Sequence, residues 1–254
     1  AGSVAGQLNF NVAGTVVFPA TANLTFGRVN AGQPTTVTNN GTVTVGLSGL
    51  TKGGGGGGTW TNAAGSTLIL NTGATAPAVD PAWTLITNSG TLTLNGSGAI
   101  PAITNGATGT LNISATPTVP TITTLTVSAV GNTVNYDGVG AQTVIAAAYS
   151  NLILSGSGVK TMLTGTSVTG NLSIAPTGTA TASVAAGQNL TVNSLTLGGL
   201  GRVNGTWGSS SSTATYQNNT YFAATTGILT ITTDTRATPT VITPPTATGI
   251  TYGQ

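Results

Sequence analysis

The sequence predicts an all-β chain that folds as a right-handed parallel β-helix, a β-solenoid, of roughly ten coils. Three observations favour this fold class. An apolar–any–apolar pattern recurs every 18 to 25 residues, β-branched residues predominate between Gly, Asn and Pro, and helical periodicity is almost absent. One coil of a solenoid cannot bury its apolar side alone, so such a repeat requires stacked neighbours.

The repeat defines a ladder of eight short strands, which we expect to form the solenoid proper over residues 43–197. Their first residues are Val43, Leu68, Leu92, Leu111, Val134, Leu152, Leu172 and Leu190. We expect the Leu, Val and Ile side chains of the ladder to stack inside the coils. Thr, Ser and Asn are then expected outside.

Both flanks of the ladder depart from the pattern. Residues 1–42 are split by Pro19 and Pro34 and predict an irregular β segment that serves as a cap or an assembly strand. Residues 198–232 contain the highest density of aromatic residues and predict a closing unit, because the last coil of a solenoid must be covered. Residues 233–254 predict a Thr/Pro linker and the start of a further domain.

Charge is scarce throughout the chain. Charged residues make up 3% of the sequence, with five Lys or Arg, three Asp, no His and a net charge of +2, whereas a typical domain has about 25%. Five dispersed cations cannot neutralise a row of phosphates, so nucleic acid is not an expected partner. No apolar run approaches the ~20 residues that span a bilayer, so no transmembrane segment is expected.

The same inventory argues against chemistry. General acid–base catalysis needs paired titratable groups, and here only Asp80, Asp137 and Asp234 are acidic. We therefore expect no enzyme, no catalytic residue, no metal and no cofactor. Six glycines at 53–58 predict a loop, since a phosphate-binding loop would place a Lys after them. Lys160 is expected to extend its ammonium group to water.

Two surface features could bind a partner. Trp207, Tyr216 and Tyr221 are candidate glycan contacts, because aromatic faces suit sugar rings, although aromatic residues in such a segment more often form core or cap. Thr at alternate strand positions resembles the pattern of ice-binding solenoids. Because Thr-x-Thr does not recur at constant spacing in the sequence, we expect a poor match to a crystal lattice.

Several stretches resemble known sequences. Residues 134–144, followed by 149–158, look like repeat units of very large bacterial surface proteins, and residues 205–231 are similar to the segment that closes such blocks. Residues 245–254 resemble the opening of an MBG-type repeat domain found in the same proteins. The resemblance implies a secreted, repetitive, adhesin-like protein of the cell surface, with no catalytic residues to carry over.

Taken with the composition, these features predict a non-catalytic structural protein, an extracellular filament subunit or stalk of a bacterial surface. The expected partner is a second copy of the chain, joined head to tail by strand addition, or another surface protein. The alternative is an adhesin module that binds a glycan.

Overall fold

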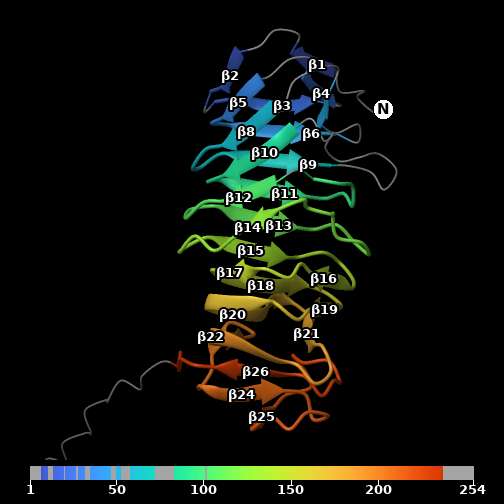
Figure 1. Cartoon of the computed structure of the whole chain (residues 1–254), viewed down its shortest axis with the longest axis vertical. Helices are drawn as coiled ribbons and strands as arrows, with labels where there is room; N and C mark the ends of the chain where they lie inside the picture. The colour runs from blue at the N-terminus through green and yellow to red at the C-terminus, as the bar shows by residue number, and fades with distance from the viewer. Residues whose placement is uncertain are drawn as a thin grey trace, which may run out of the picture.

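The protein is an elongated column of stacked coils (Figure 1). This computed structural model describes residues 7–10, 14–19, 21–26, 28–31, 35–46, 50–52, 58–71, 83–100 and 102–236. The described residues form 26 strands and no helix, and most neighbouring strands run parallel. The prediction of an all-β parallel solenoid is therefore confirmed.

A long sheet runs along most of the column. Its parallel strands are β3 (Asn23–Phe26), β6 (Thr42–Val45), β9 (Thr67–Leu70), β11 (Thr91–Leu94), β13 (Thr110–Ile113), β15 (Thr133–Tyr136), β18 (Asn151–Gly156), β20 (Ser167–Gly178) and β22 (Asn189–Leu197). Seven successive pairings lead from β6 to β22, giving a solenoid of about seven turns. The figure of roughly ten coils and the right-handed sense stay predictions.

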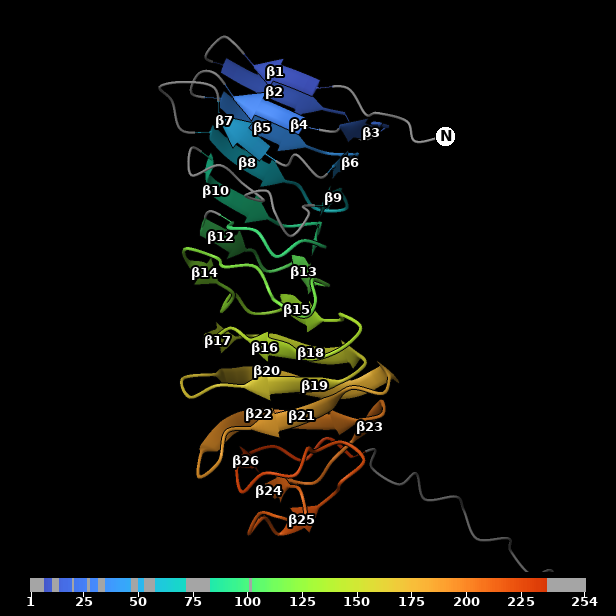
Figure 2. The same ribbon diagram turned by 90° about the vertical axis from the view of Figure 1, so that its right-hand side faces the viewer.

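A second sheet forms another side of the same coils. It contains β2 (Gly14–Phe18), β5 (Thr35–Asn39), β8 (Gly58–Asn62), β10 (Trp83–Asn88), β12 (Ala102–Asn105) and β14 (Leu125–Thr126). Lower in the column β17 (Ala148–Tyr149) pairs with the first residues of β20. The strands of this six-stranded sheet follow one another down one side in Figure 2.

Two short sheets form a third side at separate heights. The N-terminal one contains β1 (Gln7–Phe10), β4 (Arg28–Ala31) and β7 (Leu50–Lys52), and the other contains β16 (Gln142–Val144), β19 (Val159–Met162) and β21 (Thr181–Val184). The column thus has three sheets where these strands occur. Lys52 ends β7, and most of the predicted glycine loop after it lies outside the described residues.

The core follows the predicted ladder. Val43, Leu68, Leu92, Leu111, Val134, Leu152 and Leu172 are fully buried and occupy one register column of the long sheet. The eighth predicted member, Leu190, is buried in a strand of the same sheet but lies outside this register column. Leu172 pairs with Leu195, whereas Leu190 pairs with Leu229. The nine-residue strand β22 contains the apolar–any–apolar pattern twice, and only its second copy continues the column.

The parallel register also continues ahead of residue 43, because Leu24 pairs with Val43. The described strands of this segment pair in parallel with the strands of the following coil. The division of the chain at residues 42, 197 and 232 stays a prediction.

A ladder of buried asparagines joins the two main sheets. Asn39, Asn62, Asn88 and Asn105 are fully buried, each at the end of its strand. The side-chain amides of the first three each donate to the side-chain carbonyl of the next asparagine, at 2.8, 2.8 and 2.7 Å. The same amides also donate to main-chain carbonyls of the long sheet, as Asn88 does to Thr110 at 3.0 Å. The expectation that Asn lies outside is wrong for these four. Their side-chain amides supply hydrogen bonds to polar groups at the corner between the two main sheets, and these groups would otherwise lack those bonds.

The C-terminal end changes strand direction. The strand β26 (Ile228–Ile231) pairs in parallel with β22, but β24 (Gly205–Gly208) pairs antiparallel to β26. Two small strands, β23 (Leu200–Gly201) and β25 (Tyr216–Gln217), complete this region. The run of parallel pairing that starts at β3 ends at β26, and β25 then pairs in parallel with β24. Residues 237–254, with the MBG-like segment, lie outside the described residues.

Candidate functional site

The three predicted glycan contacts occupy different environments near the C-terminal end. The rings of Trp207 in β24 and Tyr216 in β25 stack with centroids 4.9 Å apart and an angle of 26°. Trp207 is buried, and its Nε1 donates to the Val203 carbonyl at 3.0 Å. Tyr216 is 37% exposed, while Tyr221 is half-buried against the core. Of the three, Tyr216 alone is exposed, and its ring stacks on the buried ring of Trp207.

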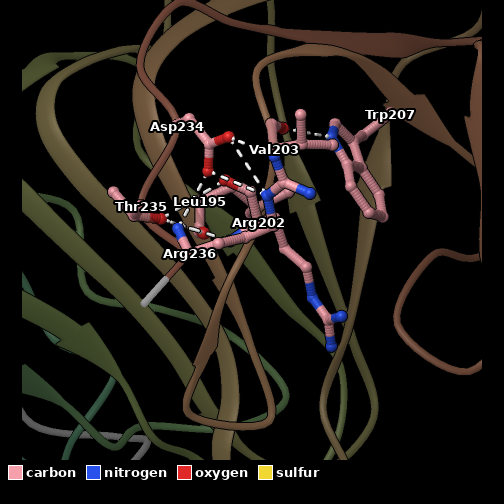
Figure 3. A network of polar contacts seen from close by, with 7 residues as sticks. All are labelled: Leu195, Arg202, Val203, Trp207, Asp234, Thr235 and Arg236. Atoms are coloured by element: carbon pink, nitrogen blue, oxygen red, sulfur yellow. Dashed lines mark hydrogen bonds and ion pairs between the residues drawn. The ribbon is translucent and has the colours of Figure 1, made fainter. Parts of the chain in front are cut away.

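Residues 234–236 lie near Trp207 and are held by polar contacts (Figure 3). The main chain of Thr235 donates to the Arg202 carbonyl at 3.0 Å, and its hydroxyl donates to the Leu195 carbonyl at 3.1 Å. Gly201 lies so close to Thr235 that a Cβ there would be 2.0 Å from the Thr235 oxygen. These contacts hold Thr235 against residues 195–202, which is a structural role.

The acidic residues are scattered. Asp137 accepts a hydrogen bond from the Ser114 hydroxyl at 2.6 Å, and Asp234 forms an exposed ion pair with Arg236 at 2.7 Å. Asp80 lies outside the described residues. Among the residues that the structure describes, no group of three or more His, Cys, Asp or Glu could hold a metal ion.

Lys160 corrects a prediction. Its side chain is fully buried, so the expectation that the ammonium group reaches water is wrong. The Nζ atom donates to the carbonyls of Gly138 at 2.7 Å and Gly140 at 3.0 Å, and to Oε1 of Gln142 at 2.7 Å. An ammonium group has three donors, and these three oxygens match them. Lys160 points inward because it shares a face of β19 with the buried Met162.

This burial predicts an unusual pH dependence. Desolvation lowers the pKa of Lys160 from 10.5 to about 8, opposed by the charge of Asp137. Above pH 8 the unfolded chain therefore holds this proton more tightly than the folded chain. The free energy of unfolding should rise between pH 8 and pH 10, by no more than about 1.4 kcal/mol per pH unit, the limit for one proton.

Above pH 10 two tyrosines reverse the trend. Burial raises the pKa of Tyr136 to about 12 and also raises that of Tyr149, and their hydroxyl oxygens lie 3.1 Å apart. Unfolded tyrosines ionise first, so stability should then fall. Urea midpoints measured from pH 7.5 to 11 test this maximum. The Lys160→Met variant should be less stable throughout and lose the rise below pH 10. An equal rise in that variant would contradict the assignment to Lys160.

A third feature is the outward face of the long sheet, which sequence reasoning underestimated. Its half-exposed side chains form two columns, which we call the threonine face: Thr42, Thr67, Thr91, Thr110, Thr133 and Asn151 in the first, and Thr44, Ile69, Thr93, Asn112, Asn135 and Ile153 in the second. The signal was present in the sequence. The residue directly before each apolar ladder position is Thr in five consecutive coils.

The expected poor lattice match rested on unequal sequence spacing. The structure shows that spacing and register are independent, because the turns absorb the extra residues while the strands pair one to one. The threonine face is therefore periodic along the column.

The chain matches no model of a known protein family, no curated protein and no solved structure. Among the residues described, no helix is long and apolar enough to cross a membrane. The candidate sites must therefore be judged on their own geometry.

Proposed function

We propose that the protein is a non-catalytic structural element, an extracellular stalk or filament subunit of a bacterial surface. The observation that carries this proposal is the uninterrupted parallel pairing from β3 to β22. Main-chain hydrogen bonds in such a stack run along the column, so a load along its axis is shared by many bonds in each coil. A right-handed path of roughly ten coils completes the proposed architecture.

The composition of the column suits this role. One core cluster of hydrophobic side chains, aliphatic and aromatic, is buried from Val37 to Ile231. Three percent of the residues are charged, so salt and pH have few groups to act on. Low charge also removes much of the repulsion between copies, which favours close assembly.

Assembly head to tail is the mode we propose. The strands β1, β2 and β3 are the last members of their sheets at the N-terminal end of the column. Parallel sheet ends are templates for a further strand, supplied here by a second copy. The antiparallel strand β24 makes the opposite end different, so the two ends would meet as unlike surfaces.

Electron microscopy of the purified chain tests the proposal. Filaments are expected from the full chain, and deletion of residues 1–30 should abolish them because it removes β1, β2 and β3. A deletion of residues 237–254 is the matched control and should leave filaments intact. Unchanged filaments after the first deletion would rule out strand addition through this end.

The glycan-binding adhesin is the second candidate, favoured by the exposed Tyr216 ring that Trp207 supports. Stacking of a sugar on this ring needs no further charged group. A glycan array separates the two functions: saturable binding lost in Tyr216→Ala and retained in Tyr221→Ala favours the adhesin. Trp207→Ala is a poorer probe, because the indole is buried.

A further inference from the structure

The threonine face has a regular geometry that the proposed stalk function does not explain. Thr42, Thr67, Thr91, Thr110 and Thr133 occupy the same register position on five consecutive strands. All five are half-exposed. Figure 1 shows the strands β9, β11 and β13 stacked in order along the column, so these five register positions form a row along its axis.

The row has two defined spacings. Neighbouring strands lie ~4.8 Å apart, and residues i and i+2 on one strand lie ~6.6 Å apart. The second column supplies Thr44, Thr93 and Asn112 at that distance, with Asn112 donating to the Thr93 hydroxyl at 3.4 Å. Threonine is β-branched and has few rotamers, so its hydroxyl and methyl groups are held in place before any partner arrives.

The composition of the face excludes most partner classes. The strands β6, β9, β11, β13, β15 and β18 contain no Asp, Glu, Lys or Arg, which argues against nucleic acid, phosphate or a charged lipid surface. The aromatic side chain on these strands, Tyr136, is fully buried and points inward. No ring on the face is therefore offered for stacking with a sugar. What suits the face is an uncharged partner with a repeating pattern of hydrogen-bonding groups.

We propose that the threonine face binds ice. Water oxygens in ice repeat in two directions with spacings close to those of the two columns. Each Thr hydroxyl both donates and accepts a hydrogen bond, so it can replace a water in such a lattice, while the adjacent methyl group fills the gap beside it. Because the face is rigid, little conformational entropy is lost on contact. This function is independent of filament assembly.

Slow growth of ice in a dilute solution of the full chain tests the proposal. The chain should be enriched in the ice relative to an inert protein of similar size. Thr110→Lys, at the centre of the row, should reduce this enrichment about tenfold, because a charge without a partner must be desolvated at the contact. Thr118→Lys is the matched control, since Thr118 is exposed in the connection between β13 and β14, outside the strands of both main sheets, and it should retain the enrichment.

Circular dichroism of both variants establishes that each is folded. Exclusion of the unmodified chain from ice would overturn the proposal, as would an equal loss in the two variants. Retention on cellulose or chitin without enrichment in ice would assign the face to a polysaccharide instead. A dimer in sedimentation that Thr110→Lys dissociates, again without enrichment in ice, would assign it to a second copy.

Discussion

Replacing Asn88 with Ala should lower the free energy of unfolding by about 3 kcal/mol or more. Its amide donates to Asn105 and to the Thr110 carbonyl, and its own carbonyl accepts from Asn62. The side chains of Asn62, Asn88 and Asn105 are fully buried in the corner between the two main sheets. The substitution leaves one N–H of Asn62, the side-chain carbonyl of Asn105 and the Thr110 carbonyl without this hydrogen bond, and each such loss costs about 1–3 kcal/mol. Urea unfolding followed by circular dichroism measures the loss.

Asn95→Ala is the matched control for this prediction. Asn95 also donates to an asparagine of the neighbouring coil, Asn71, but this pair is exposed. Water can replace the bond, so the loss should stay within about 0.5 kcal/mol. Equal losses in the two variants would show that the buried ladder contributes no more than an ordinary surface bond.

The second large effect is expected at Gly178. This residue has φ of +80°, and a Cβ there would lie 2.0 Å from the carbonyl oxygen of Gly156 in the adjacent coil. Gly178→Ala therefore combines a left-handed backbone, which costs about 1–2 kcal/mol, with displacement of a neighbouring main chain, which costs about 1–3 kcal/mol. We expect the free energy of unfolding to fall by about 3 kcal/mol.

Gly187 separates the two contributions. Its φ is +72°, yet a Cβ there would meet nothing within 4 Å. Gly187→Ala should therefore lose only the backbone contribution, about 1–2 kcal/mol. Thermal unfolding of the two variants side by side provides the comparison. If both lose the same amount, close approach of the coils at Gly178 is not a source of strain.

The part of the fold that could be predicted from the sequence is the long sheet, because a simple local pattern encodes it. The apolar–any–apolar repeat located seven of the eight expected register partners, because each strand of the long sheet buries its alternate residues. It failed at Leu190, where one long strand contains the pattern twice. The second main sheet was missed because Trp60, Trp83 and the ladder asparagines lie inside it, and these residue types do not resemble the aliphatic repeat.

The interior position of Lys160 was also encoded, although composition suggested otherwise. Lys160 lies two residues before Met162 on the same face of its strand. Gln142 and Val144 are related in the same way, as are Ala182 and Val184, and all six side chains are buried. Periodicity was therefore the better guide to burial than the charge of the residue. What no local pattern contains is the cluster of carbonyl oxygens around Nζ, which arises only when the turn at residues 138–140 is stacked beside β19.

The buried side-chain hydrogen bonds between neighbouring coils change where the asparagine ladder ends. Asn132 is the next buried asparagine after Asn105, but it donates to the Asn105 main chain at 2.8 Å, and its own Oδ1 is buried without a partner. Below this level the buried hydrogen-bonding side chains include Lys160, Gln142, the tyrosine pair and several serines. The buried hydrogen bonds between coils therefore differ on the two sides of Asn132. Under tension along the column, we expect neighbouring coils to separate first at this level, while the coils on either side of it stay folded.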